Sequence, residues 1–392
     1  MVARTFDNLE QVRTALLGYG FRSVVRLSGI AAERLAAIEQ GASPTVAEIE
    51  SLATVYGIEA DRLCDEPIEL EDGDAIELLT CSEEFQELGD SVRARIVAAA
   101  SAARDLRKLM ELGRERLPSR SEWVQLAPPD PHLPPHRQGA ALASAARQAL
   151  GLGLDPIPSV RDFVGNALPG AQLLYASLGS QGPAGVTFAD ALRAPSIVLN
   201  LDGRNRNPAV RRFSLAHEIL HLLLDWQNAE PLAIVSGFFT ESGLDRERRA
   251  NAFAVRLLCP ESVLRTFPRD NPVDAAKTLL EFGLHYGAAR IYLRNELGYE
   301  LPRTPPAELN ALGTQSWLER AEAPEGIQGF PLDDVRLERR TSVALAAARC
   351  FSSGALVRDA FAEALGVTPA HDLEAVLDWF ALPMPGAGEQ VA

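Results

Sequence analysis

The spacing of apolar residues predicts a chain that is mainly helical. Within residues 1–66 the apolar positions recur with a helical period but are broken by Gly and Pro at short intervals, which predicts four or five short helices. An acidic run over residues 69–77 is typical of a solvated linker. Beyond it, apolar positions three and four residues apart predict one long helix over residues 83–116. This seam covers too few heptads to predict a coiled coil, so we expect the helix to pack against its own chain.

A proline-rich segment divides the chain near its middle. Residues 126–137, LAPPDPHLPPHR, contain five prolines and cannot continue a helix, so we expect them to run extended between two folded units. Two helices and then two strands are predicted after this segment, over residues 139–150, 159–167, 171–178 and 196–201. The second strand leads into a helix rich in His and Leu. This order predicts a small α+β domain that ends near Gly298.

The remaining residues complete the predicted organisation. A second linker that contains prolines leads into a helical C-terminal module, in which the apolar pattern predicts three helices. The chain is therefore predicted to be a multi-domain, mainly α protein. Its predicted units are an all-α domain, a helical and proline-rich linker, the small α+β domain, a second linker and the helical module, over residues 1–66, 67–138, 139–298, 299–330 and 331–392.

Composition and charge exclude several classes of protein. The 392 residues are 47% hydrophobic and 23% charged, which is typical of globular proteins rather than fibrous or disordered ones, and their formal net charge is −15. Such an excess of acid is repelled by phosphate backbones and by anionic membranes. Any contact with DNA must therefore be made by a local basic surface.

Cysteine usage and the absence of long apolar stretches indicate a cytoplasmic protein. The four cysteines lie far apart and form no CxxC pair, which excludes a zinc knuckle and a redox motif and fits a reducing compartment. The amino terminus shows no apolar signal region, and no stretch approaches the roughly 18 uncharged apolar residues that a membrane span needs. We expect no contact with a membrane.

The stretch His217-Glu218-Ile219-Leu220-His221 carries the most informative chemistry. On a helix, residues four apart lie on one face, so both imidazoles can reach one metal ion. Glu218 projects beside them, where a carboxylate can act as a general base toward the water that such an ion holds. A catalytic zinc site uses three protein ligands and keeps its fourth position for water, so we expect a third ligand on a neighbouring element.

A second helical pattern, LDRERRANAFAVRLLCP over residues 244–260, offers that element. Its residues Glu247, Ala250, Asn251 and Ala254 share one helical face. The two alanines allow another helix to approach closely, and Glu247 supplies a carboxylate that can reach a metal ion held by that helix.

Together these motifs resemble those of the ImmA/IrrE family of metallopeptidases, which are approximately RFTLAHELGH and ExxANxFAxxLLMP. This sequence has RRFSLAHEILH and ERRANAFAVRLLCP. The resemblance covers roughly residues 139–298 and implies a zincin-like domain in which His217, His221 and Glu247 bind one catalytic Zn²⁺, with Mn²⁺ or another divalent metal as an alternative. It also implies that Glu218 is the catalytic residue.

Two positions depart from the family pattern. Leu220 replaces the usual Gly before the second His and adds bulk beside the metal-binding helix. Cys259 replaces a Met before Pro260, and because both side chains are soft and apolar we expect Cys259 to lie in the core.

Further residues are candidates for supporting roles. Asn251 and Asp225 are placed to orient the ligand histidines, although Asp225 could also be an ordinary residue of the last helical turn. A tetrahedral oxyanion needs a hydrogen-bond donor, for which His285, Tyr286 and Tyr292 are candidates. Packing in the core is the alternative for all three residues.

Residues 30–58 resemble the Xre-like, lambda-repressor-like helix-turn-helix family, on the strength of AAIEQG at the end of the expected recognition helix and the Pro-Thr that follows it. The resemblance implies DNA binding, with Arg22, Arg26 and Arg34 as candidate phosphate contacts. Acidic residues nevertheless outnumber arginines over residues 1–60, whereas DNA-binding domains are usually basic. Docking to another helix-turn-helix protein therefore stays open as an alternative.

The resemblances imply a cytoplasmic zinc-dependent endopeptidase coupled to a helix-turn-helix module. Its expected substrate is a transcriptional repressor, itself a helix-turn-helix protein, whose cleavage switches on a stress, phage or mobile-element response. A homodimer is one possible assembly. The alternative is a DNA-binding transcriptional regulator or antitoxin-like protein whose peptidase-like domain is a non-catalytic sensor. A third option is a latent enzyme that its own flanking domains restrain.

Overall fold

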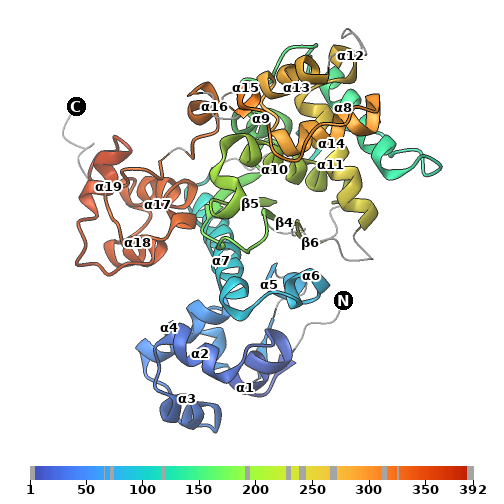
Figure 1. Cartoon of the computed structure of the whole chain (residues 1–392). Coiled ribbons are helices and arrows are strands. Elements are labelled where there is room, and N and C mark those ends of the chain that lie inside the picture. Colours follow the sequence, from blue (N-terminus) through green and yellow to red (C-terminus); the bar gives the residue numbers. More distant parts are fainter. Residues whose placement is uncertain are drawn as a thin grey trace, which may run out of the picture.

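The computed structural model describes residues 5–65, 67–70, 75–115, 120–189, 195–226, 231–237, 244–264, 272–310, 316–324 and 326–385. Within these residues the chain is mainly helical, with one four-stranded sheet and one short two-stranded ribbon. Figure 1 shows the amino-terminal helices at one end, connected by the long helix α7 to the sheet and the remaining helices. This agrees with the predicted multi-domain, mainly α organisation.

The amino-terminal region consists of short helices, as the sequence predicts. They are α1 (Leu9–Gln11) with a π-helical continuation (Val12–Leu16), α2 (Phe21–Ser28), α3 (Ala32–Glu39) and α4 (Val46–Tyr56). Thr45 and Glu48 form a capping box that starts α4, and Gly57 ends it in the left-handed conformation, at φ 70°. The strands β1 (Thr5–Phe6) and β2 (Ile68–Glu69) pair antiparallel beside these helices.

Two expectations for the following region were wrong. The acidic run over residues 69–77 is not a solvated linker throughout: residues 71–74 lie outside the described part, but Glu69 belongs to β2, and α5 (Ala75–Thr80) begins with buried residues. The long helix predicted over residues 83–116 is interrupted, because Gly89 adopts an extended conformation and caps a new helix. The result is a short α6 (Glu83–Gln86) followed by α7 (Asp90–Leu112).

The four-stranded sheet has the order β3-β5-β4-β6. The strands are β3 (Gln172–Ala176), β4 (Gly185–Ala189), β5 (Ser196–Asn200) and β6 (Leu232–Val235). Strands β3 and β5 are parallel, and β4 is antiparallel to both β5 and β6. The sequence predicted β3 and β5 but missed β4 and β6.

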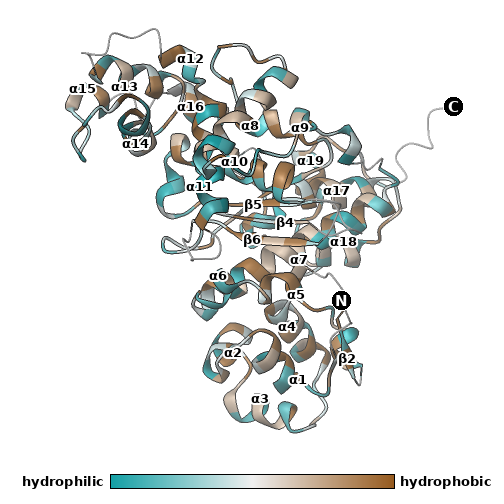
Figure 2. Cartoon of the chain, turned by 90° about the vertical axis from the view of Figure 1, so that its right-hand side faces the viewer, coloured by the Kyte–Doolittle hydropathy of each residue, from teal (hydrophilic) through white to brown (hydrophobic). Residues whose placement is uncertain are grey.

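The two faces of the sheet belong to two different cores. Leu174, Val198, Val186 and Val235 form one row across the strands and pack with α7 and the amino-terminal and C-terminal helices. Alternate residues such as Ile197 point to the opposite face, which packs against helices of the predicted α+β domain. Figure 2 shows the sheet between these two groups of helices.

Helices that share one hydrophobic core lie on the second side of the sheet, which α10 contacts directly. They are α8 (Pro135–Ala149), α9 (Val160–Ala167), α10 (Pro208–Leu220), α11 (Leu244–Leu258), α12 (Glu261–Leu264), α13 (Pro272–Glu281) and α14 (Tyr286–Leu297), followed by α15 (Ala307–Asn310) and α16 (Ser316–Ala321). The proline-rich segment is extended only in part, because Pro135 forms the first turn of α8.

The C-terminal helices pack beside α7. They are α17 (Ser342–Ser352), α18 (Arg358–Leu365) and α19 (Glu374–Trp379). Their core is continuous with that of the amino-terminal helices, and Arg339 pairs with Asp105 of α7 at 2.6 Å. Among the described helices, none combines the length and the apolar character that crossing a membrane requires.

Candidate metal centre

The structure brings the three predicted ligands together. His217 of α10, His221 just after it and Glu247 of α11 place their ligand atoms within 4.8 Å of one another, and all three side chains are buried. The Nε2 atoms of His217 and His221 are 3.0 Å apart. The carboxylate oxygens of Glu247 lie 3.3 Å from Nε2 of His217 and 3.5 Å from Nε2 of His221.

Local sequence features position the two helices that carry these ligands. Asn207 caps α10 by accepting hydrogen bonds from the backbone N–H groups of Ala209 and Val210. The helix then continues as a π-helical turn over His221–Asp225. On α11 the small residues Ala250 and Ala254 are fully buried, which lets this helix pack closely against α10.

Outer hydrogen bonds orient both imidazoles. Nδ1 of His217 lies 3.1 Å from Oδ1 of Asn251, and Nδ1 of His221 lies 2.7 Å from Oδ2 of Asp225. Since both partners are acceptors, each ring donates from Nδ1 and turns the lone pair of its Nε2 toward the cluster. Both residues that the sequence suggested as supports for the ligands therefore contact them.

Arg249 extends this set of hydrogen bonds and was missed in the sequence. Its Nη2 lies 2.7 Å from Oδ1 of Asp225, on the side away from His221. Only the position of Arg249 on α11, two residues after Glu247, could have suggested a role near the site. The positive charge of Arg249 balances the negative charge of Asp225. Burial alone would raise the pKa of Asp225, but His221 and Arg249 lower it, so the carboxylate stays ionised.

The cluster fits a divalent cation. Two Nε2 lone pairs face each other at 3.0 Å, and Oε1 of Glu247 is buried without a hydrogen-bond partner among the described residues. Burial alone lowers the pKa of His221, but the hydrogen bond to Asp225 and the nearby carboxylate of Glu247 outweigh it and raise the pKa to about 10. The site therefore attracts positive charge, and a cation bound there would take the place of the imidazole proton.

Glu218 lies beside the cluster but is not one of its members. The residue is fully buried, and its Oε2 accepts a hydrogen bond of 2.6 Å from the hydroxyl of Thr187 on β4. Its Oε1 has no hydrogen-bond partner among the described residues. A fixed carboxylate with one free oxygen next to a metal site is suited to accept a proton.

Strand β4 approaches Glu218 very closely at Gly185. A Cβ atom at this position would lie 2.6 Å from Oε1 of Glu218, so only glycine fits without a shift of the strand or of the carboxylate. Neither Thr187 nor Gly185 was identified from the sequence, because β4 itself was not predicted.

A comparison with known families agrees with this geometry. Residues 168–294 match the model of the peptidase M78 family, described as an IrrE N-terminal-like domain. The matched segment contains all three cluster residues and Glu218, and it supports a metallopeptidase-like function for this part of the chain. No curated protein matches the chain.

The candidate oxyanion donors do not contact the cluster of this peptidase-like domain. His285 caps α14, where its Nδ1 accepts a hydrogen bond from the backbone N–H of Ala288, and its ring packs edge-on against Phe213. The hydroxyl of Tyr286 donates to the carbonyl of Pro302, and Tyr292 packs its ring against Arg256.

The two positions that depart from the family motifs are both buried. Leu220 and Cys259 are each fully buried in the core that contains the metal-site helices. Cys259 therefore packs as expected, and burial raises the pKa of its thiol to about 12.

The candidate phosphate contacts of the amino-terminal region differ in their environments. Arg22 and Arg26 lie exposed on α2. Arg34 is instead held by Glu48 through two hydrogen bonds, with Nε to Oε1 at 2.8 Å and Nη2 to Oε2 at 2.7 Å.

Proposed function

We propose that the chain is a metal-dependent endopeptidase that uses Zn²⁺, with Mn²⁺ or another divalent metal as the alternative. One observation carries the proposal. A second carboxylate, that of Glu218, lies beside the cluster without being a member of it. The cluster itself presents the Nε2 atoms of His217 and His221 and a carboxylate oxygen of Glu247 that has no hydrogen-bond partner among the described residues. A purely structural metal site needs no such extra carboxylate.

The residues of the chain account for the proton transfers of peptide hydrolysis. His217, His221 and Glu247 would hold a divalent ion, which would supply Lewis-acid activation of water and of the scissile carbonyl group. Glu218 accepts a proton from the attacking water as the new C–O bond forms, and it returns the proton to the amine nitrogen as the C–N bond breaks. The hydroxyl of Thr187 fixes one oxygen of Glu218 and leaves the other for this exchange.

We propose a transcriptional repressor as the substrate, cleaved in the cytoplasm to switch on a stress, phage or mobile-element response. In this proposal helices α2 and α3 form a helix-turn-helix module. Two exposed arginines, Arg22 and Arg26, support contact with DNA phosphates, and a homodimer would double this patch. The pairing of Arg34 with Glu48 leaves α3 without a free cation, which favours docking of this helix to a protein.

A second candidate function is that of a regulator whose peptidase-like domain does not cleave. The observation in its favour is the burial of the site, since Glu218 and His221 are both 0% exposed and no peptide can reach them in this conformation. The two functions make opposite predictions for Glu218.

The test combines cleavage with metal binding. The full chain and its Glu218→Gln variant are each mixed with the product of the neighbouring gene as the candidate repressor, with and without a chelator. We expect a defined fragment only from the wild type without chelator, together with equal metal content in both proteins. Equal cleavage by the Glu218→Gln variant would contradict the proposal, and absence of cleavage by either protein would favour the regulator.

A further inference from the structure

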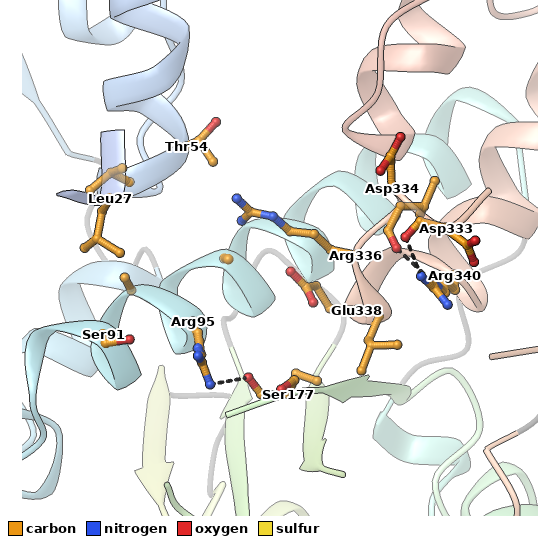
Figure 3. Close-up of a pocket in the computed structure, with 16 residues that line it drawn as sticks. Leu27, Thr54, Ser91, Arg95, Ser177, Asp333, Asp334, Arg336, Glu338 and Arg340 are labelled. Carbon is orange, nitrogen blue, oxygen red and sulfur yellow. Dashed lines mark hydrogen bonds between the residues drawn. The ribbon is translucent and has the colours of Figure 1, made fainter. Parts of the chain in front are cut away.

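A cavity of about 530 Å³ lies where three parts of the chain meet, outside the metal centre. Its walls come from the amino-terminal helices α2 and α4, from α7, and from the end of β3 together with the segment that leads into α17. Figure 3 shows this arrangement. Cavities of ~300–1,000 Å³ at such junctions are where proteins hold small molecules.

Glu338 is the most informative residue of this cavity. Its side chain is more than nine-tenths buried, with 7% of the residue exposed, yet it has no hydrogen-bond or ion-pair partner within the described part of the chain. Figure 3 shows its carboxylate directed into the cavity. A carboxylate at the wall of a cavity, with no partner among the described residues, is available to accept hydrogen bonds from a ligand.

Two arginines face the same space. The guanidinium group of Arg336 extends into the cavity from the same segment as Glu338 and has no partner among the described residues. Arg95 of α7 lines another part of the wall and points toward Ser177 (Figure 3), and its only hydrogen bond within the described residues is a long one of 3.3 Å to the carbonyl of Ser177. Both arginines are exposed, and an unpartnered and a weakly held guanidinium group around one space are suited to an anionic group such as phosphate.

The other charged groups of the wall are engaged or turned aside. Arg340 donates hydrogen bonds to the carbonyls of Val335 and Asp333, and Asp334 pairs with His371 at 3.2 Å. The carboxylate of Asp333 lies beside Arg340, away from Arg95 (Figure 3). The groups left to meet a ligand are two cations and one carboxylate.

Apolar side chains complete the wall on the side of the amino-terminal helices. Leu27 of α2 and Val55 of α4 line the cavity there, next to Ala94 and Ala98 of α7. A sugar phosphate or an inorganic anion would leave this surface without a contact. A flat heterocyclic ring would cover it and gain the free energy of apolar burial.

We propose that this cavity binds a nucleoside monophosphate. Arg336 and Arg95 bind its phosphate, Glu338 accepts hydrogen bonds from the ribose hydroxyl groups, and the base lies against Leu27 and Val55. Such a ligand contacts the amino-terminal helices and the segment before α17 at once, so its binding stabilises their arrangement. This proposal is independent of peptidase activity.

Isothermal titration calorimetry on the full chain tests the proposal with AMP and GMP as probes. Ribose 5-phosphate and inorganic phosphate are the comparators. We expect AMP or GMP to bind at least ~10-fold more tightly than both comparators, because only the nucleotide fills the apolar side of the cavity. Equal binding of phosphate, or no binding of either nucleotide at millimolar concentration, overturns the proposal.

Substitutions then locate the site. We expect Arg336→Gln to weaken nucleotide binding at least ~10-fold through loss of a charge-assisted contact. Glu338→Gln replaces one of the two acceptor oxygens for the ribose by an NH2 donor and removes a charge that repels phosphate, so nucleotide binding weakens while phosphate binding does not. The control is Arg303→Gln, at an exposed arginine outside the cavity, and it leaves binding unchanged. Equal effects of Arg303→Gln and Arg336→Gln would show that the nucleotide binds elsewhere.

Discussion

The outer hydrogen bonds of the metal centre set how firmly its histidines are held. Asp225 accepts a hydrogen bond from His221 and is itself held by Arg249. We predict that Asp225→Asn lowers metal affinity by about 10–100-fold, because the imidazole of His221 loses both orientation and basicity. Competition with a coloured chelator measures the affinity. The matched control, Asp245→Asn at an exposed position of α11, should bind metal like the wild type.

Replacing glycine by alanine should change the stability of the protein in opposite directions at two positions of the peptidase-like region. At Gly185 an added methyl group would meet Glu218 at 2.6 Å, whereas at Gly165, on the exposed side of α9, nothing lies within 4 Å of it. We predict that Gly185→Ala destabilises the protein by about 1–3 kcal/mol through steric overlap. Gly165→Ala should stabilise it by about 0.5–1 kcal/mol, because alanine favours helix. Urea unfolding of both variants checks the signs, and a stable Gly185→Ala protein would contradict the close approach of β4.

For single residues, spacing in the sequence predicts which side chains share one face of a helix, but it does not predict which residues of other elements contact that helix. His217, Glu218 and His221 follow from a spacing of four residues, and Asn251 follows from Glu247 by the same rule. Thr187 contacts Glu218 across 31 positions of sequence, on a strand of only five residues, GVTFA, in which Thr187 is the one polar side chain. Such a contact depends on tertiary packing that no local pattern encodes.

At the scale of elements, His285 makes the start of α14 sensitive to pH. Burial, assisted by Arg204, lowers the pKa of His285 to about 4. Its Nδ1 must also stay unprotonated to accept the hydrogen bond from Ala288. Between about pH 6.5 and 4 the unfolded chain therefore binds a proton that the folded chain does not, and the free energy of unfolding falls as the pH falls. We predict a loss on the order of 1–3 kcal/mol that levels off below the folded pKa.

Urea unfolding at several pH values measures this loss against a matched variant. His285→Asn keeps a side chain that can cap the helix but removes the titrating group. The difference in stability between wild type and variant should narrow or reverse from pH 7 to pH 4. A difference that stays constant over this range would show that His285 does not titrate as described.

Element boundaries show where sequence patterns are sufficient. Helices α9 and α10 begin at capping residues, Ser159 and Asn207, that can be recognised locally. The break between α6 and α7 depends on Gly89, which is followed by an apolar pattern that would also suit a continuous helix. Strand β6 spans only four residues and is held by its pairing with β4, so its own pattern is too short to predict it.

At the scale of the whole molecule, the segment between the amino-terminal helices and α7 lies against the metal centre. Helix α5 packs against β6, and both Figure 1 and Figure 2 show α5 and α6 beside this edge of the sheet. Glu84 of α6 lies 3.3 Å from Nη2 of Arg246, whose Nε is 4.0 Å from Oε1 of Glu247. The sequence could not predict this arrangement, because the acidic run before α6 has the pattern of a solvated linker.

This contact supports the latent form of the proposed enzyme, in which flanking segments cover the site. We predict that Glu84→Ala loosens α6 from α11 and exposes the metal centre, because Arg246 loses the ion pair that connects the two helices. In the metal-loaded full chain, a chelator should then remove the metal several-fold faster, and cleavage of the repressor should accelerate with it. Glu87→Ala, at an exposed residue that ends the same helix, should change neither rate. Faster metal loss without faster cleavage would show that α6 covers the metal site but does not limit cleavage. An unchanged rate of metal loss would show that α6 does not close the site.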